Sequence, residues 1–110
     1  MATTYSLAQL QGTAAVSTYG TLFSTGAAET AVISTIAVCN TAASPATYRI
    51  AVMGSAGTPA AAEWIVYDTS VPANDTSFLT VGLGIGSSKF IRVSSSANTV
   101  TFSASCAVNS

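Results

Sequence analysis

The stretch ETAVISTIAVCNTAASPATYRIAVM, residues 29–53, decides the fold. Residues 31–39 carry apolar and β-branched side chains at both alternating positions, so they predict a central strand that is covered on both faces. Residues 40–46, NTAASPA, have the Asn, Ser and Pro content of a turn. Residues 47–53 then alternate apolar with more polar side chains. The stretch therefore predicts an apolar hairpin against which the other strands stack.

Outside this pair, short strand-like runs recur at a spacing of about ten residues, bounded by Gly, Pro, Asn and Asp. No amphipathic helix is predicted, although residues 59–63 allow a loop, which is favoured, or a short helix with Thr58 as N-cap. Ser95–Asn98 is the tightest hairpin candidate. The pattern predicts an all-β fold, a single small β-sandwich or jelly-roll-like domain of seven to eight antiparallel strands. The other strands are expected within residues 14–25, 63–69, 77–81, 88–94 and 99–104.

Three segments are expected along the chain. Residues 13–104 form the β-sandwich domain, residues 1–12 precede it as an N-terminal arm or edge strand, and residues 105–110 follow it as a C-terminal tail. The core is expected to consist of inward-facing apolar side chains on the strands. These predicted core residues are Val32, Ile36, Val38, Tyr48, Ile50, Val52, Trp64, Val66, Phe78, Phe90, Val100 and Phe102.

The composition indicates a subunit of an assembly. Only seven of the 110 residues are charged, about 6%, where about a quarter is typical of soluble domains. Ala, Ser and Thr make up 52 residues. A free monomer usually keeps its surface soluble with mixed charge, so this surface is expected to be packed against neighbours. A net charge of −1 without a basic cluster argues against nucleic-acid binding, and no apolar run is long enough to predict a membrane span.

Two observations bear on the compartment. Cys39 and Cys106 are expected to be small buried hydrophobes with free thiols, and a disulfide between them is the less favoured alternative. Residues 1–12 lack the basic and apolar regions of a signal peptide. Nothing in the chain therefore calls for an oxidising compartment.

Catalysis is not expected. The sequence contains no histidine, which removes the commonest general base and a common metal ligand. Ser87 and Lys89 share a strand face, but a lysine at the rim of a polar turn is favoured over a nucleophile pair. GLGIG at residues 82–86 lacks the following helix that a dinucleotide loop needs. No catalytic residue, cofactor-binding residue, cofactor or metal is predicted, and the chain is expected not to be an enzyme.

Two binding hypotheses compete with structural alternatives. Asp68, Asn74 and Asp75 offer oxygen ligands to Ca²⁺, but they are too few to resemble a known calcium loop, so turn capping by Asn74 and Asp75 is favoured. Asn74 also begins a glycosylation sequon, which carries little weight without a secretion signal. Exposed Trp64 or Tyr67 would make a sugar-binding platform, although a place in the core is favoured for both.

Three strings together carry a family resemblance. They are VISTIAVCNTAASPATYRIAV, WIVYDTSVPANDTSFLTVGLGI and FIRVSSSANTVTFSA, in this order within residues 23–104. In these landmarks the chain resembles a family of short structural proteins encoded in the morphogenesis clusters of tailed bacteriophages and prophages. The resemblance implies a small all-β virion component without catalytic activity, and it carries over no binding residues. The chain departs from the family at residues 105–110 and in its short polar N-terminal arm.

The expected function is that of a capsid decoration (cement) protein, which stabilises a phage head by bridging subunits of the major capsid protein. Further expected partners are copies of the chain itself in a homo-oligomer, with a trimer as one option. Residues 1–12 and 54–62 are the segments expected to reach these neighbours. The expected location is the capsid surface of the virion, after synthesis in the host cytoplasm. Two alternatives stay open: a tail, baseplate or fibre module bound to tail proteins, and a carbohydrate-binding β-sandwich for host attachment.

Overall fold

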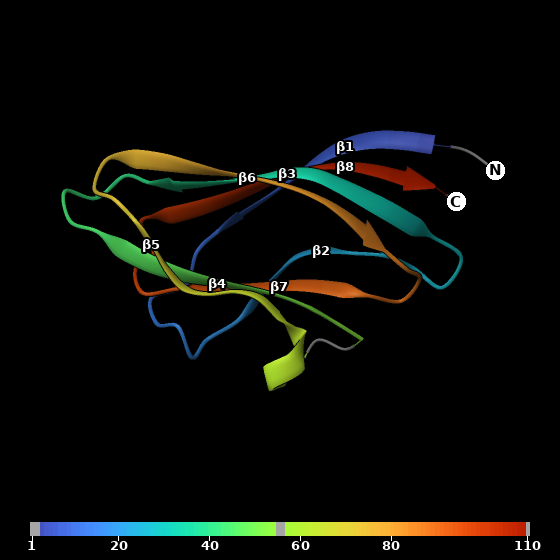
Figure 1. Ribbon diagram of the computed structural model, residues 1–110, viewed down its shortest axis with the longest axis horizontal. Helices are drawn as coiled ribbons and strands as arrows, with labels where there is room; N and C mark the ends of the chain where they lie inside the picture. Colours follow the sequence, from blue (N-terminus) through green and yellow to red (C-terminus); the bar gives the residue numbers. More distant parts are fainter. Residues whose placement is uncertain (1–2, 55–56, 110) are drawn as a thin grey trace.

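The computed structural model describes residues 3–54 and 57–109, which form two packed antiparallel sheets (Figure 1). Sheet I has the strand order β1-β8-β3-β6, and sheet II has the order β2-β7-β4-β5. The strands are β1 (Thr3–Gln11), β2 (Gly20–Ser24), β3 (Thr30–Asn40), β4 (Ala46–Met53), β5 (Trp64–Val71), β6 (Asp75–Ile85), β7 (Phe90–Ser95) and β8 (Val100–Asn109).

Successive strands alternate between the two sheets, except that β4 and β5 are neighbours in sheet II. Eight strands in this order make a jelly roll, which confirms the predicted all-β sandwich. The predicted hairpins at residues 29–53 and 95–98 are wrong, because β3 and β4, like β7 and β8, lie in opposite sheets. A strand with one apolar face satisfies its burial equally well beside its neighbour or across the core from it, so the hydrophobic pattern does not distinguish the two.

Both ends of the chain belong to sheet I. β1 pairs with β8 in an unbroken register from Thr3 opposite Asn109 to Gln11 opposite Thr101. The edge-strand alternative for the N-terminal segment therefore holds for its described residues. The predicted tail is wrong for residues 105–109, because β1 and β3 flank this part of β8 and pair with its backbone. Residues 1–2 and 110 lie outside the described residues.

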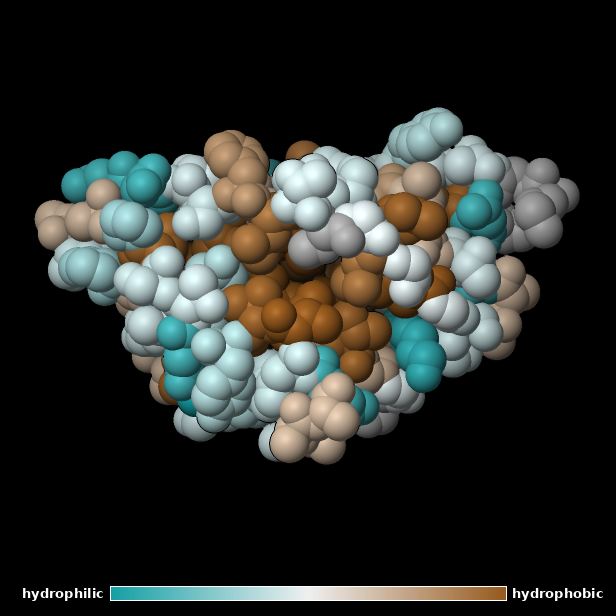
Figure 2. Space-filling view, viewed as in Figure 1, coloured by the Kyte–Doolittle hydropathy of each residue, from teal (hydrophilic) through white to brown (hydrophobic). Residues whose placement is uncertain are grey.

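The core lies between the sheets, and half of the predicted core residues are fully buried there. Tyr48 from sheet II meets Phe102 from sheet I edge to face, with 6.1 Å between ring centroids. Val52, Trp64, Val66 and Phe90 are only half-buried. Apolar residues also reach the surface along the open side between the layers (Figure 2). The predicted core residues with at most 1% exposure are Ile36, Val38, Tyr48, Ile50, Val100 and Phe102.

Val32 and Phe78 were wrongly predicted to be core residues, since their exposed fractions are 46% and 71%. For Val32 the cause is a β-bulge at Ser34: Ile33 pairs with Cys106 whereas Thr35 pairs with Ser105, so β3 has one extra residue relative to β8. Phe78 of β6 lies opposite Ala37, on the side of the sheet that faces away from the core. The extra residue reverses the alternation, and Ile33 and Ile36 both face the core. β3 is central in its sheet, but it is covered on one face only, which corrects the predicted two-sided burial.

The connection from β4 to β5 contains a short 3₁₀ helix, η1 (Ala61–Glu63). The predicted segment 59–63 thus combines a loop with one helical turn. Thr58 is not its N-cap; Ala60 holds that position, and its backbone N–H donates to Glu63 Oε1 at 2.7 Å. Residues 55–56 of the same connection lie outside the described residues.

Candidate functional site

The outer face of sheet I carries no charged side chain among its described residues. Its outward residues share cross-strand registers with one another and alternate with the core residues of the same strands. We call this surface the uncharged face. It comprises Tyr5, Leu7, Gln9 and Gln11 of β1, Thr101, Ser103, Ser105 and Ala107 of β8, Val32, Ser34, Thr35, Ala37 and Cys39 of β3, and Thr76, Phe78 and Thr80 of β6.

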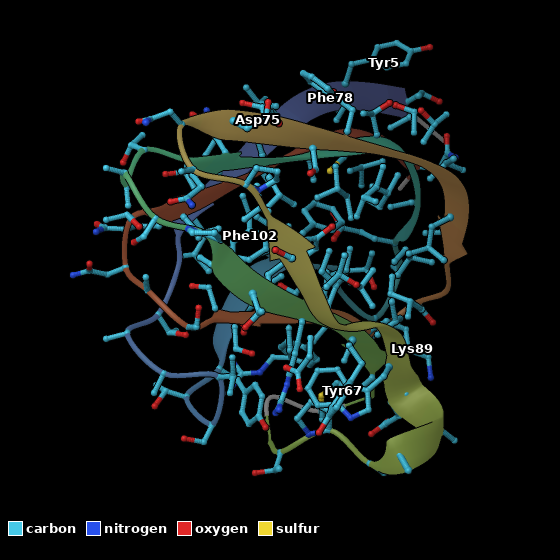
Figure 3. The ribbon with its side chains drawn as sticks, turned by 60° about the vertical axis from the view of Figure 1, so that its left-hand side comes forward. Tyr5, Tyr67, Asp75, Phe78, Lys89 and Phe102 are labelled. Atoms are coloured by element: carbon cyan, nitrogen blue, oxygen red, sulfur yellow. The ribbon has the colours of Figure 1, made fainter. Side chains whose placement is uncertain are left out.

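Large apolar side chains stand out from the uncharged face. Tyr5 and Phe78 are 82% and 71% exposed, and Figure 3 shows both pointing away from the sheet while Phe102 lies between the layers. Tyr5, Leu7 and Val32 also line a shallow groove of about 480 Å³ over β1, β8 and β3. Large apolar side chains that lie exposed together on one face are typical of interaction surfaces.

The polar groups of the uncharged face are neutral and partly occupied by one another. Gln9 Nε2 donates to Ser103 Oγ at 3.2 Å, and Ser34 Oγ donates to the Ser105 carbonyl oxygen at 3.4 Å. A partner would meet amides, hydroxyls and apolar groups here. Covering such a surface removes no formal charge from water, which is the most costly part of burying a polar surface.

The outer face of sheet II is different, because it holds an arginine among aromatic rings. Arg49 Nε and Nη2 donate to the two Asp68 carboxylate oxygens at 2.7 and 3.1 Å. The guanidinium carbon lies 4.2 Å from the Tyr67 ring centroid and 5.7 Å from that of Trp64. The Arg49 side chain is 14% exposed. Its hydrogen bonds hold the pKa of Asp68 below its ordinary value.

This cluster bears on both binding hypotheses. The Trp64 and Tyr67 rings are inclined at 70° to each other, and Arg49 already lies over Tyr67, so the two rings do not form a flat open platform for a sugar. Asp68 is engaged by Arg49, while Asp75 Oδ1 accepts from the Thr76 backbone N–H at 2.8 Å as a turn cap. Within the described residues, no three acidic or thiol side chains are grouped to hold a metal ion.

A second arginine lies half-buried on the same outer face. Arg92 Nη1 donates to Thr21 Oγ1 at 2.7 Å and Nη2 to the Tyr19 carbonyl oxygen at 3.3 Å. Its Nε atom and the Ser94 hydroxyl are buried without a partner among the described residues. The connection between β1 and β2, which supplies Tyr19, thus covers part of this face, whereas the uncharged face lies open.

The other predicted candidate residues, a serine–lysine pair and two cysteines, do not form a site. Lys89 and Ser87 are exposed in the turn between β6 and β7, as predicted for a lysine at the rim of a polar turn. Cys39 and Cys106 are both free thiols on opposite faces of sheet I, since Cys39 pairs across with Thr101 and Cys106 lies in the core. Burial raises the pKa of the Cys106 thiol and so disfavours the reactive thiolate.

Sequence reasoning missed Tyr5 and Leu7 as surface residues of interest. Their signal was present in TTYSLAQLQ, residues 3–11, where larger side chains alternate with smaller ones and no charge occurs. What it did not reveal is that β8 and β3 continue the same face, since these strands are distant in the sequence.

The fold and this surface define a class: a small jelly-roll domain with an open, uncharged and partly apolar outer face. Comparisons with protein-family models, with curated proteins and with solved structures found no match to the chain. In the part of the chain that the structure describes, there is no helix with the length and apolar character needed to span a membrane.

Proposed function

We propose that the chain is a non-enzymatic structural subunit of a tailed-phage virion, a capsid decoration protein that docks on the head through its uncharged face. The observation that carries this proposal is the outer face of sheet I, four strands wide and without a charged side chain in its described part. The resemblance of residues 23–104 to phage structural proteins supplies the kind of partner, the major capsid protein.

The chemistry of the face suits permanent contact with another protein. Interface cores are depleted in charged residues and enriched in aromatic ones, and Tyr5 and Phe78 provide exposed aromatic anchors. Between these anchors, Ser, Thr and Ala can lie close to a neighbouring backbone and lose little conformational entropy on burial. Many subunits bound side by side would reinforce a shell without strong single contacts.

The test uses phage particles that lack this protein, mixed with the purified full-length chain and imaged after gold labelling. We expect label on the heads, and we expect Phe78→Asp to reduce the bound copies at least tenfold because it places a charge on the uncharged face. The matched control is Ile65→Asp, which alters an exposed apolar residue of sheet II and should bind normally.

Each other outcome has a distinct meaning. Label confined to tails would replace the decoration role with the tail, baseplate or fibre role. Normal head binding by Phe78→Asp would exclude the uncharged face as the docking surface. Absence of label from the particles, together with binding of the chain to host glycans on an array, would favour carbohydrate recognition and reject the structural role.

A further inference from the structure

β1 is an edge strand without the usual protection against pairing. It forms one side of sheet I, so the backbone N–H and C=O groups on its outer side have no strand partner among the described residues. Its nine residues, TTYSLAQLQ, contain no charge, proline or glycine. Its register with β8 is unbroken over all nine pairs. Natural edge strands normally carry charges, prolines or bulges that prevent another strand from adding to them.

The other three edge strands carry such protection. β2 has only five residues and a register shift opposite β7. β5 has two register shifts opposite β4, and it holds the charged Asp68 with a φ of 51°. β6 has a register shift opposite β3 and Gly82 at a φ of 53°. Among the four edges, β1 alone is long, regular and uncharged.

We propose that β1 pairs with β1 of a second copy, antiparallel, so that two sheets I join into one eight-stranded sheet. A two-fold axis through Leu7 places Leu7 opposite Leu7, Tyr5 opposite Gln9 and Thr3 opposite Gln11 of the other copy. Every side chain keeps its present face in this register. A homotypic pairing normally suffers when like charges meet across the strands, and β1 has no charge to bring together.

The geometry of the β1–β1 contact also determines the expected oligomeric state and the affinity between the two copies. An isologous contact closes at two copies, so a dimer is the expected species in place of the trimer considered from the sequence. Nine residues extend over about 30 Å, which gives a narrow interface with a dissociation constant on the order of 1–100 μM. The pairing concerns the chain alone and does not depend on a phage shell, but it would double the width of the uncharged face.

The primary experiment is sedimentation velocity of the purified full-length chain from about 1 to 500 μM, a range that spans the expected constant. We expect a monomer–dimer equilibrium that Leu7→Lys weakens at least thirtyfold, because it places two ammonium groups opposite each other at the two-fold axis. Leu7 is 59% exposed, so the variant should keep its circular dichroism spectrum. Phe78→Lys, an equally drastic change on the far edge of the same face, should leave the dimer unchanged.

Cross-linking tests the register. In a Cys39→Ser background, Leu7→Cys should form a covalent dimer under mild oxidation, whereas Gln11→Cys, which faces Thr3 of the other copy, should not. A chain that stays monomeric at 500 μM, a trimer, or equal cross-linking by the two cysteine variants would overturn the proposal. A dimer that fails to bind phage heads would count against the proposed function and leave this pairing intact.

Discussion

At the scale of single residues, Gly12 shows how closely the loops pack against the sandwich. It is buried where β1 leaves sheet I, and its backbone N–H donates to the Val100 carbonyl oxygen at 2.6 Å. A Cβ atom there would lie 2.2 Å from Ser95 Oγ and 2.7 Å from that carbonyl oxygen. Ser95 Oγ cannot move freely, because the hydroxyl group donates a shared hydrogen bond to the carbonyl oxygens of Thr13 and Ala97, each 2.9 Å away. The absence of a side chain is therefore required by space.

We expect Gly12→Ala to lower the free energy of unfolding by about 1–3 kcal/mol through overpacking. The control is Gly84→Ala in β6, where a Cβ atom would meet nothing within 4 Å and the change should stay within about 0.5 kcal/mol. Urea denaturation of both variants measures the difference. Equal urea midpoints for the two variants would show that the turn around Ser95 shifts to make room for the added methyl group.

The difference in burial between Ile36 and Lys89 predicts which substitution costs more stability. Ile36 is fully buried in β3, and Lys89 is exposed in the turn before β7. Ile36→Ala should cost about 2–5 kcal/mol, since it removes three carbon atoms and leaves a cavity. Lys89→Ala should cost less than about 0.5 kcal/mol. Coincident denaturation midpoints for the two variants would contradict this order.

At the scale of elements, the alternation of side chains located the strands, but it did not reveal how they connect. The bulge at Ser34 adds a single residue that has no compositional signature in VISTI, residues 32–36, and it moved Val32 out of the predicted core. The turn chemistry of residues 40–46 correctly predicts a connection between two strands. Whether that connection closes a hairpin or crosses the core depends on buried polar contacts that are distant in the sequence.

Asn40 supplies those contacts at one end of the sandwich. Its side chain is buried, and its Nδ2 group donates to the carbonyl oxygens of Ser44 at 2.9 Å and Pro72 at 3.3 Å. Its Oδ1 atom accepts from the Ala42 backbone N–H and from Thr99 Oγ1, each at 3.1 Å. One amide thus ties together the connections β3–β4, β5–β6 and β7–β8, which all cross between the sheets.

Replacement of this amide should loosen all three crossings together. We expect Asn40→Ala to cost about 2–4 kcal/mol, because four part-buried hydrogen bonds are lost and their partners in three connections are left without the Asn40 amide. Asn98→Ala, at an exposed asparagine in the neighbouring turn, should cost less than about 0.5 kcal/mol. Thermal unfolding followed by circular dichroism compares them, and similar melting temperatures would show that the Asn40 contacts contribute little net stability.

At the scale of the whole molecule, the seven charges are unevenly placed. Arg49 and Asp68 pair over sheet II, and the outer face of sheet I holds no charge among its described residues. The low charge count predicts an assembly subunit from the composition alone. The position of the uncharged face, our proposed docking surface, was not predictable in the same way, because β1, β8, β3 and β6 become neighbours only through the jelly-roll topology.

The same scarcity of charge shapes the dependence of stability on pH. The chain has four carboxylates and no histidine, so few groups can couple protonation to folding between about pH 5 and 8. The hydrogen bonds from Arg49 lower the pKa of Asp68 from its ordinary value of 3.8. Stability that depends on the Asp68 carboxylate is therefore present above this value and is lost as the pH falls through the lower pKa of the folded state.

The alkaline limit has the opposite sign. Burial raises the pKa of Cys106 and of Tyr48 above their ordinary values of 9.0 and 10.0. The stability linked to these neutral groups is complete below the ordinary values and falls as the pH rises through the raised ones. We therefore expect a plateau of urea midpoints near neutral pH, with a decline below about pH 4 and another above about pH 9. Asp68→Asn should lower the plateau, meet the wild-type curve in strong acid and keep the alkaline decline. If the two acid limbs instead run parallel down to pH 2, the Arg49–Asp68 pair does not govern acid stability.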